Sequence, residues 1–251
     1  MSVMHFAALS LVGDSMRDPG LYWRANVLSS LTLIEAAVAA GCLDFVFSST
    51  CATYGDQDGV VLNEDTAQNP INAYGKSKLA IEQMLGDFAS AHGVRPVIFR
   101  YFNVAGADPE GEVGEHHRPE THLIPLMLDA VAGKRPALTV FGTDYPTADG
   151  TCVRDYVHVM DLVDAHVLGL KWLRDGKGPQ TFCLGTGSGF SVREVIDQSR
   201  LITNRDVPVI YGGRRAGDAV KLVCGSDRAV RELGWRPAET FESGIRKTVQ
   251  W

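Results

Sequence analysis

The sequence lacks a hydrophobic run long enough to cross a membrane. Membrane-spanning helices need about 20 consecutive apolar residues, and no stretch of the 251 residues approaches that length. The opening segment Met1–Phe6 also lacks the basic start and the apolar stretch of a secretory signal peptide. We therefore expect neither a secretory leader nor an association with a membrane.

Paired cysteine motifs are missing as well. The chain has 5 cysteines, and none stands in a C-x-x-C spacing. Most lie in or beside apolar stretches, which favours reduced, buried thiols and a cytoplasmic protein. His116, His117 and His122 are spread along a polar loop. They are expected to be solvated side chains, so no metal site is predicted.

An excess of basic residues is also absent. The chain has 24 Lys and Arg against 30 Asp and Glu, a formal net charge of −6. Nucleic-acid-binding domains carry basic patches, so nucleic acid is not an expected partner. A small anionic substrate stays possible, because a local arginine cluster matters more than the total charge. With 45% apolar and 22% charged residues, the composition is that of one large or two small globular domains.

Strand-like and helical patterns alternate in the first hundred residues. Leu43–Ser49 and Val94–Phe102 are apolar runs typical of buried parallel strands. Helical periods cover 27–38, which Gly41 is expected to end, and 73–92. Strand, helix and strand joined by short connections predict a βαβ arrangement and hence an α/β fold.

The pattern changes after residue 102. Residues 103–122 are rich in Gly, Pro and charge, and loops of this length are usually functional. Asp161 is expected to N-cap a helix, and Ser191 with Glu194 predicts a capping box. Gly185–Gly189 does not have the G-x-G-x-x-G spacing, so it is interpreted as a structural turn or a substrate-rim loop.

Tyr74 and Lys78 carry the strongest chemical signal. They stand four residues apart in the helix over 73–92, so they share one face. An ammonium beside a phenol favours the phenolate, which is a base. Thr50 follows a predicted strand, at the sheet edge where α/β proteins bind ligands. Taken alone, a tyrosine at a helix start is more often a packing residue, so the pair gains its meaning from this context.

Several longer motifs carry a family resemblance. They are His5-Phe6-Ala7-Ala8, Phe47-Ser48-Ser49-Thr50, Tyr74-Gly75-Lys76-Ser77-Lys78, Arg100-Tyr101-Phe102-Asn103, Phe141-Gly142-Thr143-Asp144-Tyr145 and Val153-Arg154-Asp155-Tyr156-Val157-His158. With them the chain resembles the extended short-chain dehydrogenase/reductase superfamily, and within it the UDP-glucose 4-epimerase family. The resemblance implies a Rossmann-like parallel sheet with a smaller C-terminal α/β substrate domain. Residues 1–103 would form the NAD-binding part and 104–251 mainly the UDP-sugar part, with about 142–180 returning to the first sheet.

The resemblance implies NAD as cofactor, a UDP-hexose as substrate and epimerisation at C4 through a 4-keto sugar. Tyr74 would be the base, Lys78 would hold the nicotinamide ribose and lower the Tyr74 pKa, and Thr50 would bond the reacting hydroxyl. The residues implied to bind NAD are Phe6, Ala7, Ala8, Leu9, Asn26, Thr50, Tyr74, Lys78 and Phe102. Those implied to bind substrate are Thr50, Tyr74, Asn103, Leu123, Arg154, Arg215 and Asp218.

Three departures from the family pattern are visible. No G-x-G-x-x-G fingerprint precedes His5, so the chain is expected to lack an N-terminal part of the sheet, to bind NAD weakly and to have little activity alone. Cys183 stands where the family has Asn, and Ala219 follows Asp218 where Pro is usual. These two departures leave open which sugar the protein uses.

Two alternatives stay open. A catalytically impaired fragment of such an epimerase is one. The other is a related epimerase or a 4,6-dehydratase, although a dehydratase needs an acid pair where Cys51-Ala52 follows Thr50. The resemblance also implies a homodimer formed by the helices near 27–40 and 73–92.

Overall fold

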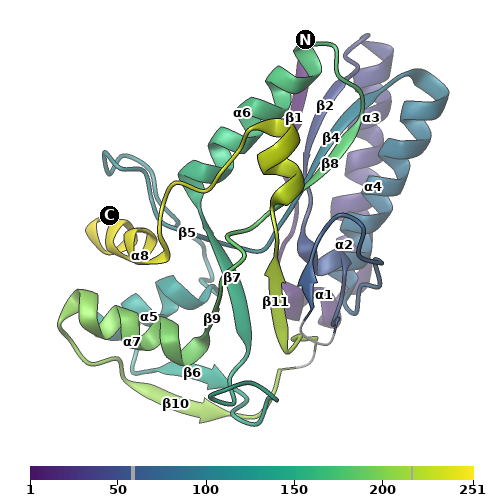
Figure 1. Cartoon of the computed structure of the whole chain (residues 1–251). Coiled ribbons are helices and arrows are strands. Elements are labelled where there is room, and N and C mark those ends of the chain that lie inside the picture. The colour runs from purple at the N-terminus through teal and green to yellow at the C-terminus, as the bar shows by residue number, and fades with distance from the viewer. Residues whose placement is uncertain (58–59, 216) are drawn as a thin grey trace.

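The computed structural model describes residues 1–57, 60–215 and 217–251. Figure 1 shows a sheet flanked by long helices and a second group of shorter elements around the C-terminus. The strands are β1 (Ser2–His5), β2 (Asp44–Ser48), β3 (Val61–Leu62), β4 (Arg95–Tyr101), β5 (Asn103–Ala105), β6 (Leu138–Phe141), β7 (Val153–His158), β8 (Gln180–Leu184), β9 (Gly189–Ser191), β10 (Val209–Gly212) and β11 (Lys221–Cys224). The helices are α1 (Val12–Arg17), α2 (Pro19–Tyr22), α3 (Ser29–Ala39), α4 (Ala73–His92), α5 (Leu123–Val131), α6 (Val159–Arg174), α7 (Val192–Thr203) and α8 (Phe241–Gln250), with helical turns η1 (Trp23–Leu28), η2 (Cys51–Thr53) and η3 (Ala229–Leu233).

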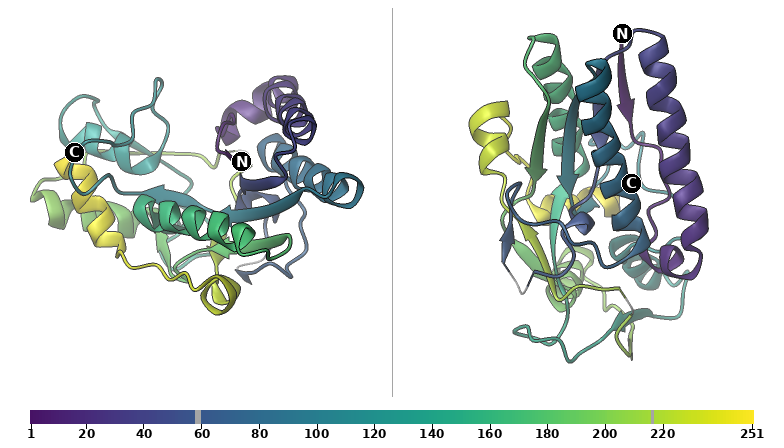
Figure 2. Two further views of the ribbon diagram at one scale, coloured as in Figure 1. Left: turned by 90° about the horizontal axis from the view of Figure 1, so that it is seen from above. Right: turned by 90° about the vertical axis from the view of Figure 1, so that its right-hand side faces the viewer.

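The first sheet is parallel and runs in the order β1-β2-β4-β8. Figure 2 shows α6 on one of its faces and α3 with α4 on the other. Side chains alternate between the two faces along β2, so Phe45 and Phe47 pack toward α3 and α4 while Val46 packs toward α6. A parallel strand covered on both faces must be apolar throughout. The expected α/β fold with a Rossmann-like parallel sheet is confirmed.

The second group of elements is built on two further sheets. One has the order β3-β11-β7-β5, with β9 antiparallel to β7, and the other pairs β6 with β10. Helices α5, α7 and α8 enclose a separate hydrophobic core with these strands. Strand β8 and helix α6, from the second half of the chain, belong to the first sheet. The division at residue 103 stays a prediction.

Local signals set several helix ends. Asn72 caps α4 by accepting a hydrogen bond from Gly75 N at 2.8 Å, and Gly93 ends it at φ 73°. The capping box of Ser191 and Glu194 is present at the start of α7. The prediction that Asp161 caps a helix is wrong, because α6 begins at Val159 and His158 is its cap. The Asp161 carboxylate instead accepts hydrogen bonds from the backbone of residues 238 and 239.

No helix formed by the described residues is both long and apolar enough to cross a membrane. The cysteines are buried and free, as predicted.

Candidate active site

Thr50, Tyr74 and Lys78 meet at the carboxyl edge of the parallel sheet. Lys78 is 3% exposed, and its Nζ donates a 2.7 Å hydrogen bond to the carbonyl oxygen of Ser48, the last residue of β2. Thr50 lies two residues beyond that strand and its hydroxyl accepts from the backbone N–H of Ala52 at 3.1 Å. Tyr74 is half-buried in the first turn of α4. A cation, a phenol and a hydroxyl therefore share one edge of the sheet.

The first turn of α4 is held close to the loop after β2 by a glycine. A Cβ atom on Gly75 would lie only 2.5 Å from the carbonyl oxygen of Ala52. Any other residue would push α4 away from this loop. Gly75 therefore allows Tyr74 to approach Thr50.

The electrostatics of the pair follow from burial. Burial raises the pKa of the Tyr74 phenol, with the side chain of Thr50 acting in the opposite direction. Burial lowers the pKa of the Lys78 ammonium to about 8, and Glu82 opposes that change. The Tyr74 pKa is thus not lowered in the chain by itself. A phenolate at neutral pH needs the Lys78 charge together with positive charge from a bound group.

Asn26 joins the loop after β1 to α4. Its amide donates to the Leu9 carbonyl at 2.9 Å and to Ser77 Oγ at 3.0 Å, and its oxygen accepts from Leu9 N at 2.8 Å. Asn26 is 1% exposed and lies in the π-helical turn η1. The structure therefore uses the Asn26 side chain to fix the backbone at Leu9, and its direct contact with a cofactor stays a prediction.

A histidine that sequence reasoning did not select lies behind this edge. His166 Nδ1 donates to the Leu162 carbonyl at 2.7 Å, so its Nε2 accepts from Ser48 Oγ at 2.8 Å. Burial lowers the pKa of His166, which keeps the ring neutral. The ring of Phe6 packs on it at 4.7 Å between centroids. A lone histidine in an apolar helix resembles a core residue, so no local signal marks it.

The residues at this edge fit the nicotinamide half of NAD. Phe6 is 56% and Leu9 37% exposed, although both are apolar. Ala7 is exposed, and Ala8 and Phe102 are half-buried. These apolar side chains offer a surface for a flat ring, and the buried Lys78 ammonium has donors for ribose hydroxyls beyond the one given to Ser48. NAD would thus be held by the residues that follow β1 together with Lys78 and Tyr74.

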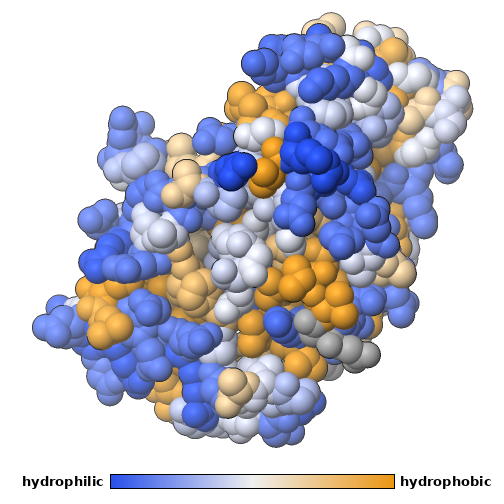
Figure 3. Space-filling view, viewed as in Figure 1, coloured by the Kyte–Doolittle hydropathy of each residue, from blue (hydrophilic) through white to orange (hydrophobic). Residues whose placement is uncertain are grey.

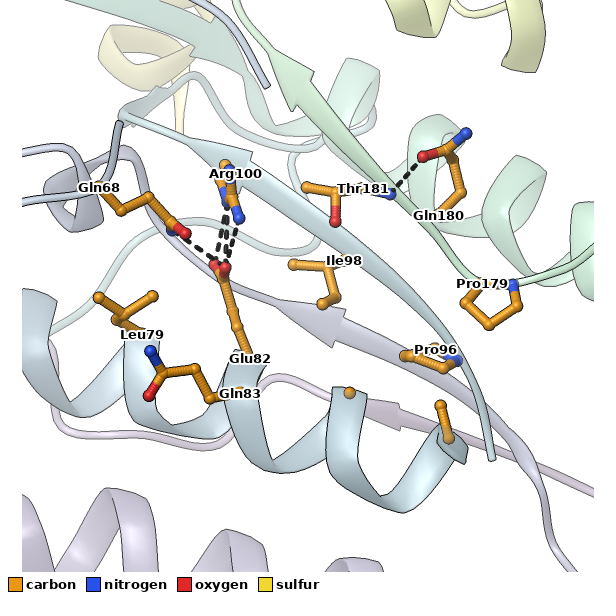
Figure 4. A pocket seen from close by; sticks show the side chains of 12 residues that line it. Gln68, Leu79, Glu82, Gln83, Pro96, Ile98, Arg100, Pro179, Gln180 and Thr181 are labelled. Atoms are coloured by element: carbon orange, nitrogen blue, oxygen red, sulfur yellow. Dashed lines mark hydrogen bonds and ion pairs between the residues drawn. The ribbon is translucent and has the colours of Figure 1, made fainter. Parts of the chain in front are cut away.

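A buried ion pair, which sequence reasoning missed, supports α4 one turn beyond Lys78. Figure 4 shows Glu82 receiving hydrogen bonds from Arg100 and Gln68. Arg100 Nε lies 3.1 Å from both carboxylate oxygens, and Ser49 also donates to Glu82. The pair borders a cavity of about 380 Å³ between α4, β4 and β8. Glu82 stands four residues after Lys78 on the same face of the helix, and this spacing could have marked it as a residue near the site.

The structure brings three predicted substrate residues together. Arg215 donates through Nε and Nη2 to the two oxygens of Asp218 at 3.1 and 3.0 Å. Arg154 Nη2 lies 4.0 Å from Asp218 Oδ1. A Cβ on Gly217, within this loop, would lie 3.8 Å from Cβ of Asn72, the cap of α4. Gly217, the residue before Asp218, therefore lies beside the start of the helix that carries Tyr74.

The remaining predicted substrate residues, Asn103 and Leu123, begin β5 and α5. Both are half-buried. The Asn103 side chain interacts with the phenol of Tyr156 and counters the burial that raises its pKa to about 12.

Comparisons of sequence and of structure find similarity to the same group of proteins. The sequence profile of the NAD dependent epimerase/dehydratase family matches residues 1–185. A UDP-glucose 4-epimerase of Rhizobium meliloti (strain 1021) is 50% identical over 250 residues, which make up 100% of this chain and 76% of that protein. The structure of UDP-glucose 4-epimerase from Brucella ovis in complex with NAD is similar at a TM-score of 0.95 and 45% identity, over 99% of this chain and 77% of that chain. The enzyme from Bifidobacterium longum in complex with NAD+ and UDP is similar at a TM-score of 0.94 and 34% identity, over 100% of this chain and 75% of that chain.

Proposed function

Because the chain belongs to the NAD dependent epimerase/dehydratase family, we propose that it interconverts UDP-glucose and UDP-galactose by NAD-dependent epimerisation at C4 of the hexose. The meeting of Thr50, Tyr74 and Lys78 at the carboxyl edge of the parallel sheet carries this proposal. When bound, NAD supplies the hydride exchange at C4.

Tyr74, Lys78 and Thr50 have different roles in the proton transfer. Tyr74 Oη removes the proton of the C4 hydroxyl as a general base and returns it as a general acid. Lys78, whose pKa of about 8 keeps most of it charged at pH 7, favours the phenolate that burial opposes. Thr50 Oγ1 hydrogen-bonds the reacting hydroxyl and orients it toward Tyr74.

The nucleotide-sugar diphosphate is bound by Arg154 and Arg215. Guanidinium groups match phosphate oxygens in a bidentate geometry. In the structure both face Asp218, so substrate binding requires the diphosphate to share or replace this carboxylate. Asp218 is then free to accept a hydrogen bond from the ribose of uridine.

Tyr74→Phe tests the function directly. With NAD added, turnover of UDP-galactose is measured by coupling the UDP-glucose formed to its dehydrogenase. In a cofactor-competent form, loss of general acid–base catalysis is typically worth about 10²–10⁴-fold, so the rate should fall by that factor. Tyr211→Phe is the matched control, because Tyr211 is 63% exposed on β10. Equal rates in the two variants would contradict the role of Tyr74.

A 4,6-dehydratase is less well supported by this site. That reaction needs an acid beside Thr50 that can protonate a leaving hydroxyl. Cys51 stands there, is 0% exposed, and burial raises its pKa. A buried thiol of this kind is a poor proton donor to a sugar.

The assembly and location that we propose are a homodimer in the cytoplasm. The dimer would form through helices near 27–40 and 73–92, next to the exposed apolar side chains of Trp23 and Leu28. Free, buried cysteines support a reducing compartment. Light scattering of a well-folded sample should give twice the mass of the chain, and a monomer would contradict the dimer.

A further inference from the structure

Four side chains of the segment between β5 and α5 converge on one point. Glu115, His117, Glu120 and His122 each offer one ligand atom, and these atoms all lie within 4.8 Å of one another. The sequence predicts histidines that are dispersed and solvated; the loop folds back and brings His117 and His122 together, while both side chains stay about half exposed. The segment projects from the body near α8 in Figure 1, and its outer end is hydrophilic in Figure 3.

The spacing of these atoms is close to that of a coordination shell. His117 Nδ1 lies 3.2 Å from Glu115 Oε1 and 3.5 Å from Glu120 Oε2, and His122 Nδ1 lies 3.8 Å from Glu120 Oε1. His122 Nδ1 also contacts Glu115 Oε1. In a tetrahedral zinc site with bonds of about 2.0–2.2 Å, neighbouring ligand atoms are roughly 3.3–3.6 Å apart. The four ligand atoms lie within 4.8 Å of one another, so side-chain shifts of about an ångström, including an opening of the His122–Glu115 contact, would bring them to this spacing.

We propose that Glu115, His117, Glu120 and His122 form a binding site for a divalent transition-metal cation, with Zn²⁺ as the ion that fits best. Two imidazole nitrogens and two carboxylate oxygens are donors that Zn²⁺ accepts. Two carboxylates and two neutral imidazoles also carry a charge of −2, which one Zn²⁺ balances.

The surrounding backbone holds the ligands in place. Glu120 Oε1 accepts hydrogen bonds from Thr121 N at 2.7 Å and His122 N at 2.8 Å, which fixes this carboxylate. A Cβ on Gly114 would lie 2.1 Å from the indole of Trp251, so only glycine lets the loop pack against the C-terminal helix next to Glu115. Ligands whose own partners orient them bind metals more tightly.

The site is open to solvent, so an ion can reach it. The side chains of His117 and His122 are 49% and 46% exposed, and those of Glu115 and Glu120 are 22% and 14% exposed. A cavity of about 780 Å³, lined in part by Glu115, His117 and Glu120, opens beside them toward α5, α7 and α8.

Metal binding would hold the start of α5 in place. The ion would tie Glu115 to His122, and Leu123, the first residue of α5, follows directly. The side chain of His122 makes no capping hydrogen bond at this helix start, so it is available to the ion. The site does not depend on the proposed function, because none of its four ligands is assigned to Tyr74, Lys78 or Thr50 chemistry.

Calorimetric titration with Zn²⁺ of the chain dialysed against a chelator tests the site. We expect one saturable equivalent per chain. His117→Ala removes a direct ligand, which should weaken binding by more than the roughly 10–100-fold lost with a ligand's hydrogen-bond partner. His116→Ala is the matched control, because His116 is the neighbouring histidine and its ring accepts from Arg118 instead of joining the cluster. Co²⁺ in place of Zn²⁺ should give the visible absorption of a tetrahedral site in the parent chain and in His116→Ala.

Glu115→Gln is the second variant, since it keeps the shape of the side chain and its fold is checked by circular dichroism. It should also weaken Zn²⁺ binding while leaving the spectrum of the fold unchanged. Absence of a saturable equivalent in the parent chain would overturn the proposal. Equal loss of affinity in His116→Ala and His117→Ala, or full affinity in both His117→Ala and Glu115→Gln, would overturn it as well.

Discussion

Replacing Glu82 with alanine should destabilise the protein strongly, because it leaves a buried charge without its partner. The side chains of Glu82 and Arg100 are 5% and 9% exposed, and Arg100 Nη2 lies 2.5 Å from Glu82 Oε2. Removing one member of a buried ion pair costs about 3–5 kcal/mol, since the other charge stays desolvated. Ser49 and Gln68 lose an acceptor in the same change, so the upper part of this range is expected.

Urea unfolding followed by circular dichroism measures this loss in the free energy of unfolding. In a thermal melt of a chain of this size, a loss of about 3–5 kcal/mol corresponds to a fall in the melting temperature of about 6–20 °C. The double variant E82L/R100M should be less destabilised than Glu82→Ala, because no buried charge is left unpaired. Asp164→Ala is the control on the exposed side of α6, where surface changes stay within about 0.5 kcal/mol. A Glu82→Ala variant within about 1 kcal/mol of the parent, or a double variant less stable than the single one, would refute the reasoning.

Two further predictions concern the site. Burial lowers the pKa of Lys78 from 10.5 to about 8, so the unfolded chain binds more protons between these values and the contribution of Lys78 to stability rises with pH from about 8 to 10.5. Urea unfolding at several pH values should show this rise in the parent and lose it in Lys78→Met, and an identical pH profile in the variant would argue against the buried ammonium. Thr50→Ala should reduce turnover of UDP-galactose less than Tyr74→Phe does, because it removes a hydrogen bond and not the proton acceptor, and Thr50→Ser should keep most of the rate. A rate for Thr50→Ser as low as that for Thr50→Ala would show that more than the hydroxyl is needed.

The local elements of this protein can be predicted from the order of its residues. The bounds of α4 follow from Asn72 and Gly93, a cap and a left-handed stop that act within a few residues. The i, i+4 spacing of Tyr74 and Lys78 places both on one helix face, and the apolar run before Thr50 predicts the parallel strand β2.

The contacts between distant segments depend on the tertiary structure. Asp161 has the residue type of a cap, but its carboxylate is used by backbone N–H groups more than 70 residues away. The Glu82–Arg100 pair, the bond between Ser48 and His166, and the convergence of His117 with His122 likewise depend on how the chain folds back. Local backbone and capping preferences act over a few residues and can be read along the chain. The pairing of buried charges and ligands depends on which segments pack together, and the hydrophobic cores of the whole chain determine that.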